Sequence, residues 1–222
     1  MGTNARFVWH DLMAADVEGA KSFYGELFGW KFKRGEGDSN YEHIYAGEQG
    51  IGGVMKNDPQ TGAPPHWLGY VAVDDVDQTV ATITTNGGKV YMPKMDIPTV
   101  GSFAVTADPD KASKFYSAVF GWDIETMEMP NFGTYTLLKR KGVKDETGAD
   151  KNAGGIMKLP PSVPHPFWLA YVAVPDCDAV VAKATKLGGV VPMPPMDIPD
   201  VGRIATILDP QQVPIAVLAP KR

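Results

Sequence analysis

Residues 100–116 read Val-Gly-Ser-Phe-Ala-Val-Thr-Ala-Asp-Pro-Asp-Lys-Ala-Ser-Lys-Phe-Tyr, and they belong to two repeats at once. Toward the C-terminus they begin a repeat, because Phe115-Tyr116 and the following Phe-Gly-Trp motif recur at a spacing of 92 residues. The matching pairs are Phe23-Tyr24 with Phe115-Tyr116, and Phe28-Gly29-Trp30 with Phe120-Gly121-Trp122.

Toward the N-terminus the same stretch ends a repeat. Met95-Asp-Ile-Pro98 through Asp108-Pro109 recurs as Met196-Asp-Ile-Pro199 through Asp209-Pro210, at a spacing of 101 residues. Ser102–Pro109 therefore matches both the tail of one repeat and the head of the next. Internal repetition of this kind is a stronger indication of fold than any single residue.

Each repeat has the pattern of one strand, one helix and three further strands. In the first, an apolar strand over residues 7–13 precedes a helix that Asp16 caps and Gly29 ends, with apolar residues at three- and four-residue steps. Strands at 30–33, 41–46 and 51–55 follow. The second unit begins at His66, and the fourth runs from Phe167 to Pro220. The second unit lacks a closing strand, because the chain enters the helix of the third unit directly after Asp108-Pro109, a strong helix-start signal.

The composition is that of a globular protein. The chain has 222 residues, 44% of them hydrophobic, and a net charge of −5, which argues against nucleic acid as a partner. No run reaches the roughly 18 apolar residues that span a bilayer, and the start has no signal-peptide pattern. Cys177 is the only cysteine, so no intrachain disulfide can form, and we expect a cytoplasmic protein without a membrane partner.

These units resemble the glyoxalase/bleomycin-resistance/extradiol-dioxygenase family, the vicinal-oxygen-chelate superfamily, and in particular its tandem two-domain subgroup. The motifs that carry the resemblance are Trp9-His-Asp-Leu-Met13, the two Phe-Tyr…Phe-Gly-Trp helices and the two Met-Asp-Ile-Pro-x-Val-Gly loops. The resemblance covers nearly all of residues 6–220. It implies an α+β fold of paired βαβββ units whose curved mixed sheets enclose apolar cups, with a strand missing at the junction.

The resemblance also implies a domain arrangement. We expect one glyoxalase-like domain over residues 1–109, which lacks its last strand, and a second over 102–222, which shares the strand 102–109. Edge groups left open by the missing strand invite pairing with another chain. We therefore predict a homodimer, strand-exchanged or otherwise intertwined.

Metalloenzymes of this family carry a ligand on the first strand of each unit, and His10 and His66 stand at those positions in the first two units. With a carboxylate they would suit Zn, Ni, Fe or Mn. The carboxylates that the family places on closing strands are absent: residues 51–55 contain no acid, and Ile215-Ala-Val217 stands at the corresponding place in the fourth unit. The sequence therefore favours histidines with ordinary hydrogen bonds over a complete metal site.

Methionine and tryptophan side chains are concentrated near the expected cup walls, and such side chains suit adaptable apolar pockets. The predicted ligand-binding residues are Trp9, Met13, Trp67, Met95, Trp168 and Met196. The leading hypothesis is a protein that binds a small molecule in this cup. The alternatives are a metal-dependent glyoxalase I-like lyase or isomerase using His10 and His66, and a degenerate fold kept only for assembly. The sequence identifies neither a general base nor the ligand.

Overall fold

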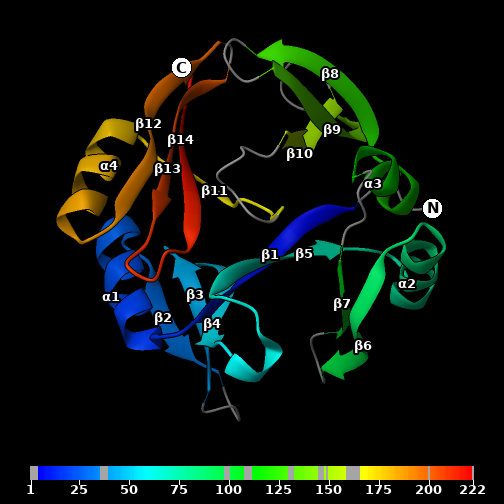
Figure 1. The fold of residues 1–222 in the computed structure, drawn as a ribbon, viewed down its shortest axis with the longest axis horizontal. Coiled ribbons are helices and arrows are strands. Elements are labelled where there is room, and N and C mark those ends of the chain that lie inside the picture. The colour runs from blue at the N-terminus through cyan, green and yellow to red at the C-terminus, as the bar shows by residue number, and fades with distance from the viewer. Residues whose placement is uncertain are drawn as a thin grey trace. The chain divides into compact units, whose positions relative to one another are not determined.

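The computed structural model of the chain describes residues 5–35, 40–97, 101–107, 112–129, 133–144, 148, 150–158, 166–199 and 201–221. Its order of elements repeats the pattern of strand, helix and strands along the chain (Figure 1). The first two repeats comprise β1 (Arg6–Ala14), α1 (Val17–Phe28), β2 (Lys31–Arg34), β3 (Tyr41–Ala46), β4 (Gln49–Lys56), a 3-10 turn (Pro59–Thr61), β5 (His66–Ala72), α2 (Val76–Thr85), β6 (Lys89–Ile97) and β7 (Gly101–Ala107). The last two comprise α3 (Ala112–Phe120), β8 (Asp123–Met129), β9 (Gly133–Lys144), β10 (Asp150–Met157), β11 (Tyr171–Ala173), α4 (Cys177–Lys186), β12 (Val190–Ile198), β13 (Gly202–Leu208) and β14 (Pro214–Pro220).

The strands form mixed sheets. One sheet has the order β2-β3-β4-β1-β5, and another the order β11-β14-β13-β12. In both, the first strand of a repeat runs parallel to its closing strand, β1 to β4 and β11 to β14, while the pairings between consecutive strands are antiparallel. The predicted α+β class with paired βαβββ units is confirmed.

Local sequence signals explain the helix boundaries. The Asp16 side chain accepts a hydrogen bond from the Gly19 amide and begins α1, and Gly29 ends it with φ of 72°, a left-handed conformation that glycine adopts without strain. Asp75 and Asp176 cap α2 and α4 in the same way. The predicted start signal of α3 at Asp108-Pro109 lies outside the described residues.

The chain divides into two compact units that are discontinuous in sequence. One comprises residues 8–70 and 167–222, and the other comprises residues 1–7 and 71–166. The first therefore joins repeats one and four, and we call it the outer-repeat unit; the second contains the helices of repeats two and three, and we call it the inner-repeat unit. The sequence ranges 1–109 and 102–222 group the repeats differently and stay a prediction.

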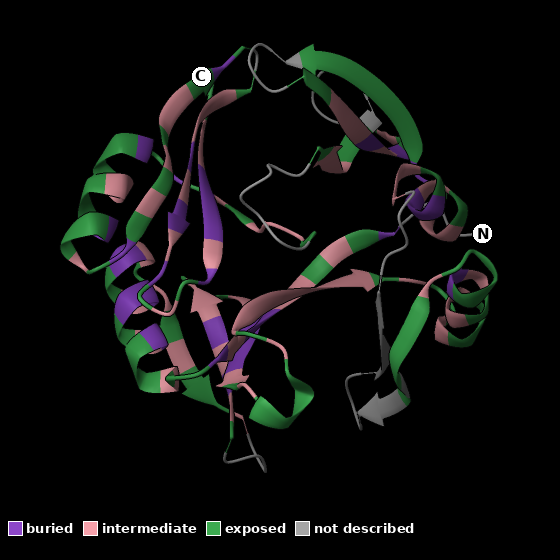
Figure 2. Cartoon of the chain, in the orientation of Figure 1, coloured by how far each residue is buried: buried purple, intermediate pink, exposed green. Residues whose placement is uncertain are grey.

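The outer-repeat unit is built around one apolar core. It is formed by residues of β1, α1, β3 and β4 together with residues of α4, β13 and β14 (Figure 2). Its fully buried members include Leu12, Tyr24, Ile44, Ile207 and Ile215. Each such side chain contributes about 1.5–3 kcal/mol on burial, so this core holds the first and last repeats together.

The repeated aromatic motif forms the same cluster in each unit. Tyr24 stacks on Phe28 at 6.2 Å with an interplanar angle of 16°, and Tyr116 stacks on Phe120 at 6.1 Å and 11°. Trp122 is buried in the inner-repeat unit, where its Nε1 donates a 3.0 Å hydrogen bond to the Ala5 carbonyl. The motif therefore packs each helix onto the strand that follows it.

Candidate functional site

Strand β1 presents two chemically different faces. Leu12 and Ala14 are fully buried in the core with α1. Because side chains alternate along a strand, Trp9, Asp11 and Met13 point to the opposite face of the sheet. We call this the open face of the β1 sheet.

Asp11 is the centre of a hydrogen-bonded cluster on the open face. The side chain is only 5% exposed. Its Oδ1 accepts hydrogen bonds from Trp9 Nε1 at 2.9 Å and from the Tyr41 hydroxyl at 2.8 Å, and its side chain also accepts one from Tyr70. β1, β3 and β5 each supply a member, so the cluster requires these strands to share one sheet.

The two phenols remain donors at neutral pH. Burial, and after it the negative charge of Asp11, raises the pKa of Tyr41 and of Tyr70 above the ordinary phenol value. Proton loss from either phenol would place a second negative charge beside Asp11. The carboxylate is therefore stabilised by three neutral donors, and a carboxylate has about four lone-pair sites.

Aromatic side chains surround this carboxylate. His43 packs edge-on against Trp9 and Tyr41, with ring centroids 6.0 and 5.2 Å apart. Gly53 lies beneath the Tyr41 ring, and a Cβ added there would be 2.0 Å from the Tyr41 hydroxyl oxygen. Glycine at this position is what allows Tyr41 to lie flat against β4 and reach Asp11.

The structure does not bring the two predicted metal ligands together. His10 lies on the face of Leu12 and Ala14, and burial lowers its pKa although Asp11 acts in the opposite direction. Trp67, the next residue of β5, packs against the core, so His66 lies on the other face of the strand, the face of Tyr70. The Nδ1 of His66 is 2.7 Å from the Pro64 carbonyl oxygen. The histidines thus occupy opposite faces of one sheet.

The donor set therefore does not fit an ion held by both histidines. Within the described ranges, no three His, Cys, Asp or Glu side chains are grouped as metal ligands would be.

The predicted ligand-binding residues have different positions. Trp9 and Met13 lie on the open face, beside Asp11. Trp67 belongs to the core, where its ring meets that of Tyr24 edge-on at 5.5 Å and its Nε1 donates to the Tyr24 hydroxyl at 3.4 Å. Trp67 is therefore a packing residue.

The other three predicted residues lie elsewhere. Met196 is on β12 opposite Ile204 of β13. Ala205, which follows Ile204, points into the core, so Ile204 and its partner Met196 point away from the core. Trp168 is half-buried and precedes β11. Met95 lies on β6 opposite Phe103, and its side chain is outside the described residues.

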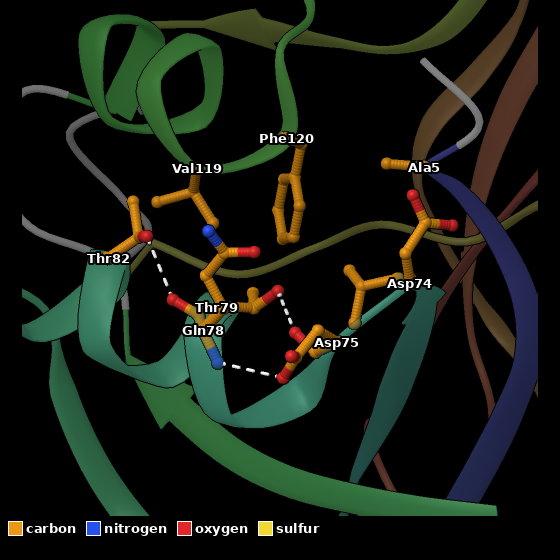
Figure 3. Close-up of a pocket in the computed structure, with 9 residues that line it drawn as sticks. Ala5, Asp74, Asp75, Gln78, Thr79, Thr82, Val119 and Phe120 are labelled. Atoms are coloured by element: carbon orange, nitrogen blue, oxygen red, sulfur yellow. Dashed lines mark hydrogen bonds between the residues drawn. The ribbon is translucent and has the colours of Figure 1, made fainter. Parts of the chain in front are cut away.

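A pocket of about 270 Å³ lies in the inner-repeat unit (Figure 3). It is bordered by the start of α2, the end of α3 and Ala5, and none of the predicted ligand-binding residues lines it. Its polar groups are used by the helix itself: Asp75 accepts from the Gln78 amide at 3.0 Å, and Thr79 donates to the Asp75 carbonyl at 2.7 Å. Asp74, which also lines the pocket, is exposed.

Sequence reasoning missed Asp11 and Tyr70. The sequence did contain an indication for Asp11. Because side chains alternate along β1, Asp11 lies on the face opposite Leu12 and Ala14, where it is a carboxylate among aromatic and methionine residues. Tyr70 carried no comparable signal, since its approach to Asp11 depends on β5 lying beside β1.

Two family models match the chain. The glyoxalase/bleomycin resistance protein/dioxygenase superfamily matches residues 6–110, and a bleomycin resistance protein-like N-terminal family matches residues 104–134. The matches overlap at residues 104–110, and residues 104–109 of this overlap belong to the stretch that resembles both the tail and the head of a repeat.

Similar sequences extend over almost the whole chain. "Putative glyoxylase CFP32" of Mycobacterium tuberculosis (strain CDC 1551 / Oshkosh) is 33% identical over 253 aligned positions, covering 96% of this chain and 94% of the relative. "Anthracycline biosynthesis protein DauV" of Streptomyces sp. (strain C5) is 29% identical, covering 95% and 91%. Since 96% of 222 residues is about 213, about 40 of the 253 aligned positions have no residue in this chain.

Solved structures share the fold. The chain is similar to a catechol 2,3-dioxygenase, with a TM-score of 0.59, 9% identity and coverage of 98% of this chain and 91% of that one. It is also similar to an Mn(II)-bound glyoxalase from Novosphingobium aromaticivorans, with a TM-score of 0.54, 15% identity and coverage of 98% and 82%. These structures show that the fold is shared. The family-model match over residues 6–110 and the 33% identical relative, aligned over nearly the whole chain, show that the chain belongs to the glyoxalase/bleomycin resistance protein/dioxygenase superfamily.

Proposed function

We propose that this protein binds a small organic molecule on the open face of the β1 sheet, with Asp11 as the polar anchor. The observation that carries the proposal is the buried Asp11 carboxylate, held by Trp9, Tyr41 and Tyr70 on the face that points away from the core. Burying a charge is costly unless it is paired or hydrogen-bonded, and a carboxylate kept inside an aromatic surface is a typical feature of a ligand site.

The chemistry of this face defines the ligand class. Trp9, Met13, Tyr41 and His43 supply apolar and aromatic contact area, and the carboxylate accepts hydrogen bonds. A ligand with an apolar or aromatic body and at least one hydroxyl or amine donor is complementary to both features. One relative is named a putative glyoxylase and another an anthracycline biosynthesis protein, so we select α-oxoaldehyde adducts and polycyclic aromatic antibiotics as the compounds to test.

A substitution pair tests the site. Asp11→Asn keeps the shape of the side chain but removes its charge and one acceptor oxygen, and we expect it to raise the Kd of a bound compound at least tenfold by calorimetry. Asp74→Asn, at the rim of the pocket in Figure 3, serves as the matched control and should leave the Kd within twofold. The converse result would move the binding site to that pocket.

The compounds themselves come from a thermal-shift screen of thiol adducts of α-oxoaldehydes and of polycyclic aromatic antibiotics. A compound that raises the melting temperature of the wild type but not of Asp11→Asn supports the proposal. If no compound shifts the wild type and none quenches tryptophan fluorescence, the ligand-binding function is wrong. A metal-dependent enzyme and a fold kept for assembly are then the remaining hypotheses.

Elemental analysis of the purified protein tests the metal-dependent alternative. Stoichiometric Zn, Ni, Fe or Mn that is lost in both His10→Ala and His66→Ala would overturn a metal-free site and support a lyase of the glyoxalase type. We expect neither substitution to change the metal content.

A cytoplasmic location belongs to the same proposal, because the one cysteine, Cys177, is buried as a free thiol.

A further inference from the structure

The inner-repeat unit contains a strand edge that is covered in the complete repeats. In repeats one and four, the closing strand pairs in parallel with the first strand of the same repeat, β4 with β1 and β14 with β11. In repeat three the closing strand is β10. Among the residues that the structure describes, β10 pairs with β9 on one side and with no strand on the other.

The sequence of β10 retains the feature that admits a first strand. In repeat one, Gly52 is opposite His10, and a Cβ on Gly52 would be 1.8 Å from the His10 carbonyl oxygen. Only glycine allows β1 to approach so closely. Ile51-Gly-Gly-Val-Met55 of β4 corresponds to Ala153-Gly-Gly-Ile-Met157 of β10, so the glycine is present again at Gly154.

In the described part of the chain, strand β7 pairs only with β6 and so has a complementary open edge. It pairs with β6 in the register in which β13 pairs with β12: Met95 is opposite Phe103 as Met196 is opposite Ile204. β13 also pairs with β14 on its other side, but the described residues include no strand between β7 and α3 that could take that place. The sequence of β7 also matches β1, the strand type that β10 lacks.

The two sheets that contain these edges carry exposed apolar side chains. Val90, Tyr91 and Met92 of β6 are exposed, Tyr91 to 72%, and so are Ile124 and Met127 of β8 and Met157 of β10. Met157 lies on β10 itself, whereas β6 is the partner of β7 and β8 is the strand at the far edge of the β10 sheet. Large exposed apolar side chains on these two sheets are what an unformed interface leaves uncovered.

We propose that the open edge of β10 binds β7 of a second copy of this chain, and that β7 of the first copy binds β10 of the second. Both pairings are parallel and follow the register of β1 on β4, which places Val105 opposite Met157 as Met13 is opposite Met55. The exchange is reciprocal, so it closes with two-fold symmetry and forms a dimer without growing into a fibre. The partner is a second copy of this chain, because the sequence of β7 matches β1, the type of first strand that would pair with β10.

A cysteine pair tests this register in the full chain. Cys177→Ser removes the native thiol, and Val105→Cys with Met157→Cys then places one thiol on each strand. We expect light scattering to give the mass of two 24.0 kDa chains and mild oxidation to give a covalent dimer on a non-reducing gel. Mixing and co-refolding the two single-cysteine variants should give the same covalent dimer.

The control pairs Val105→Cys with Asp150→Cys at the far end of β10, seven residues and about 23 Å from Met157, and it should not cross-link. Three results would overturn the proposal. They are a 24.0 kDa species at every concentration, a cross-link confined within one chain, or a covalent dimer from Met157→Cys alone, which would indicate pairing of β10 with β10. Circular dichroism of each variant verifies that a negative result comes from folded protein.

Discussion

The Tyr24 hydroxyl donates a 3.0 Å hydrogen bond to Oδ2 of Asp209, 185 residues further along the chain, and both side chains are fully buried. Oδ1 of Asp209 accepts from the amides of Gln211 and Val213 at 2.8 and 2.9 Å. Burial raises the pKa of Asp209 although these hydrogen bonds act in the opposite direction. The pair therefore links helix α1 of the first repeat to the β13–β14 turn of the fourth.

Tyr24→Phe removes one donor from this buried carboxylate. We expect the free energy of unfolding to fall by about 2 kcal/mol, because a hydrogen bond to a charged group is worth about 1.5–3 kcal/mol. Urea denaturation followed by circular dichroism measures the change. Tyr45→Phe is the control: it keeps the ring that lies 4.9 Å from Lys33 Nζ, and it should change stability by less than about 0.5 kcal/mol.

Gly53→Ala should disrupt the open face. The added methyl group would overlap the Tyr41 hydroxyl, so the ring must move and lose its hydrogen bond to Asp11. We expect a loss of about 1–3 kcal/mol of stability and weaker ligand binding, as for other overpacked sites.

The control for that substitution is Gly25→Ala in helix α1. A Cβ there would meet no atom closer than 3.5 Å. Because alanine has a higher helix propensity than glycine, this variant should gain up to about 1 kcal/mol. Equal destabilisation by both substitutions would show that Gly53 has no special role.

His10 should make stability depend on pH. Its pKa is lowered in the folded state, so below the unfolded value of about 6.5 the unfolded chain binds more protons than the folded one. The contribution of His10 is therefore complete above that value and is lost as the pH falls through the folded pKa. His10→Gln should lack this part of the pH dependence in urea unfolding between pH 8 and 5, and unchanged slopes would contradict the assignment.

Cys177 should react only when the protein unfolds. The side chain has no exposed area at the start of α4, and burial raises the pKa of its thiol, so little thiolate is available to attack a reagent. We expect labelling with an aromatic disulfide to be at least a hundredfold slower in the native state than in guanidinium. Rapid labelling of the native protein would mean that α4 opens locally.

Part of the candidate site could be predicted from the sequence. Trp9 and Met13 were predicted from the composition of β1 and lie on the open face. Trp67 was predicted as well, but its ring packs in the core, because the alternation along β5 turns it toward Tyr24. A single strand sequence does not show which of its faces meets the helix.

The prediction of a metal site also depended on which face of each strand meets the helix. His10 and His66 each stand on the first strand of a repeat, as a family ligand would, yet they point to opposite faces of the sheet that joins β1 to β5. The prediction of an ion at these residues stays a prediction for elemental analysis to test, and the arrangement of the side chains does not support it.

No helix in the described part of the chain is long and apolar enough to cross a membrane.

The sequence by itself determined the repeats, the capped helices and the α+β fold class, and it predicts that the second repeat lacks its closing strand. These features depend on residues that are close in the chain, so caps, alternation and spacing reveal them. Only the tertiary structure decided that repeats one and four share a core, and that Trp9, Tyr41 and Tyr70 meet at Asp11. Those contacts form because helix faces and strand edges distant in sequence are buried together, and no local pattern specifies which of them will pair.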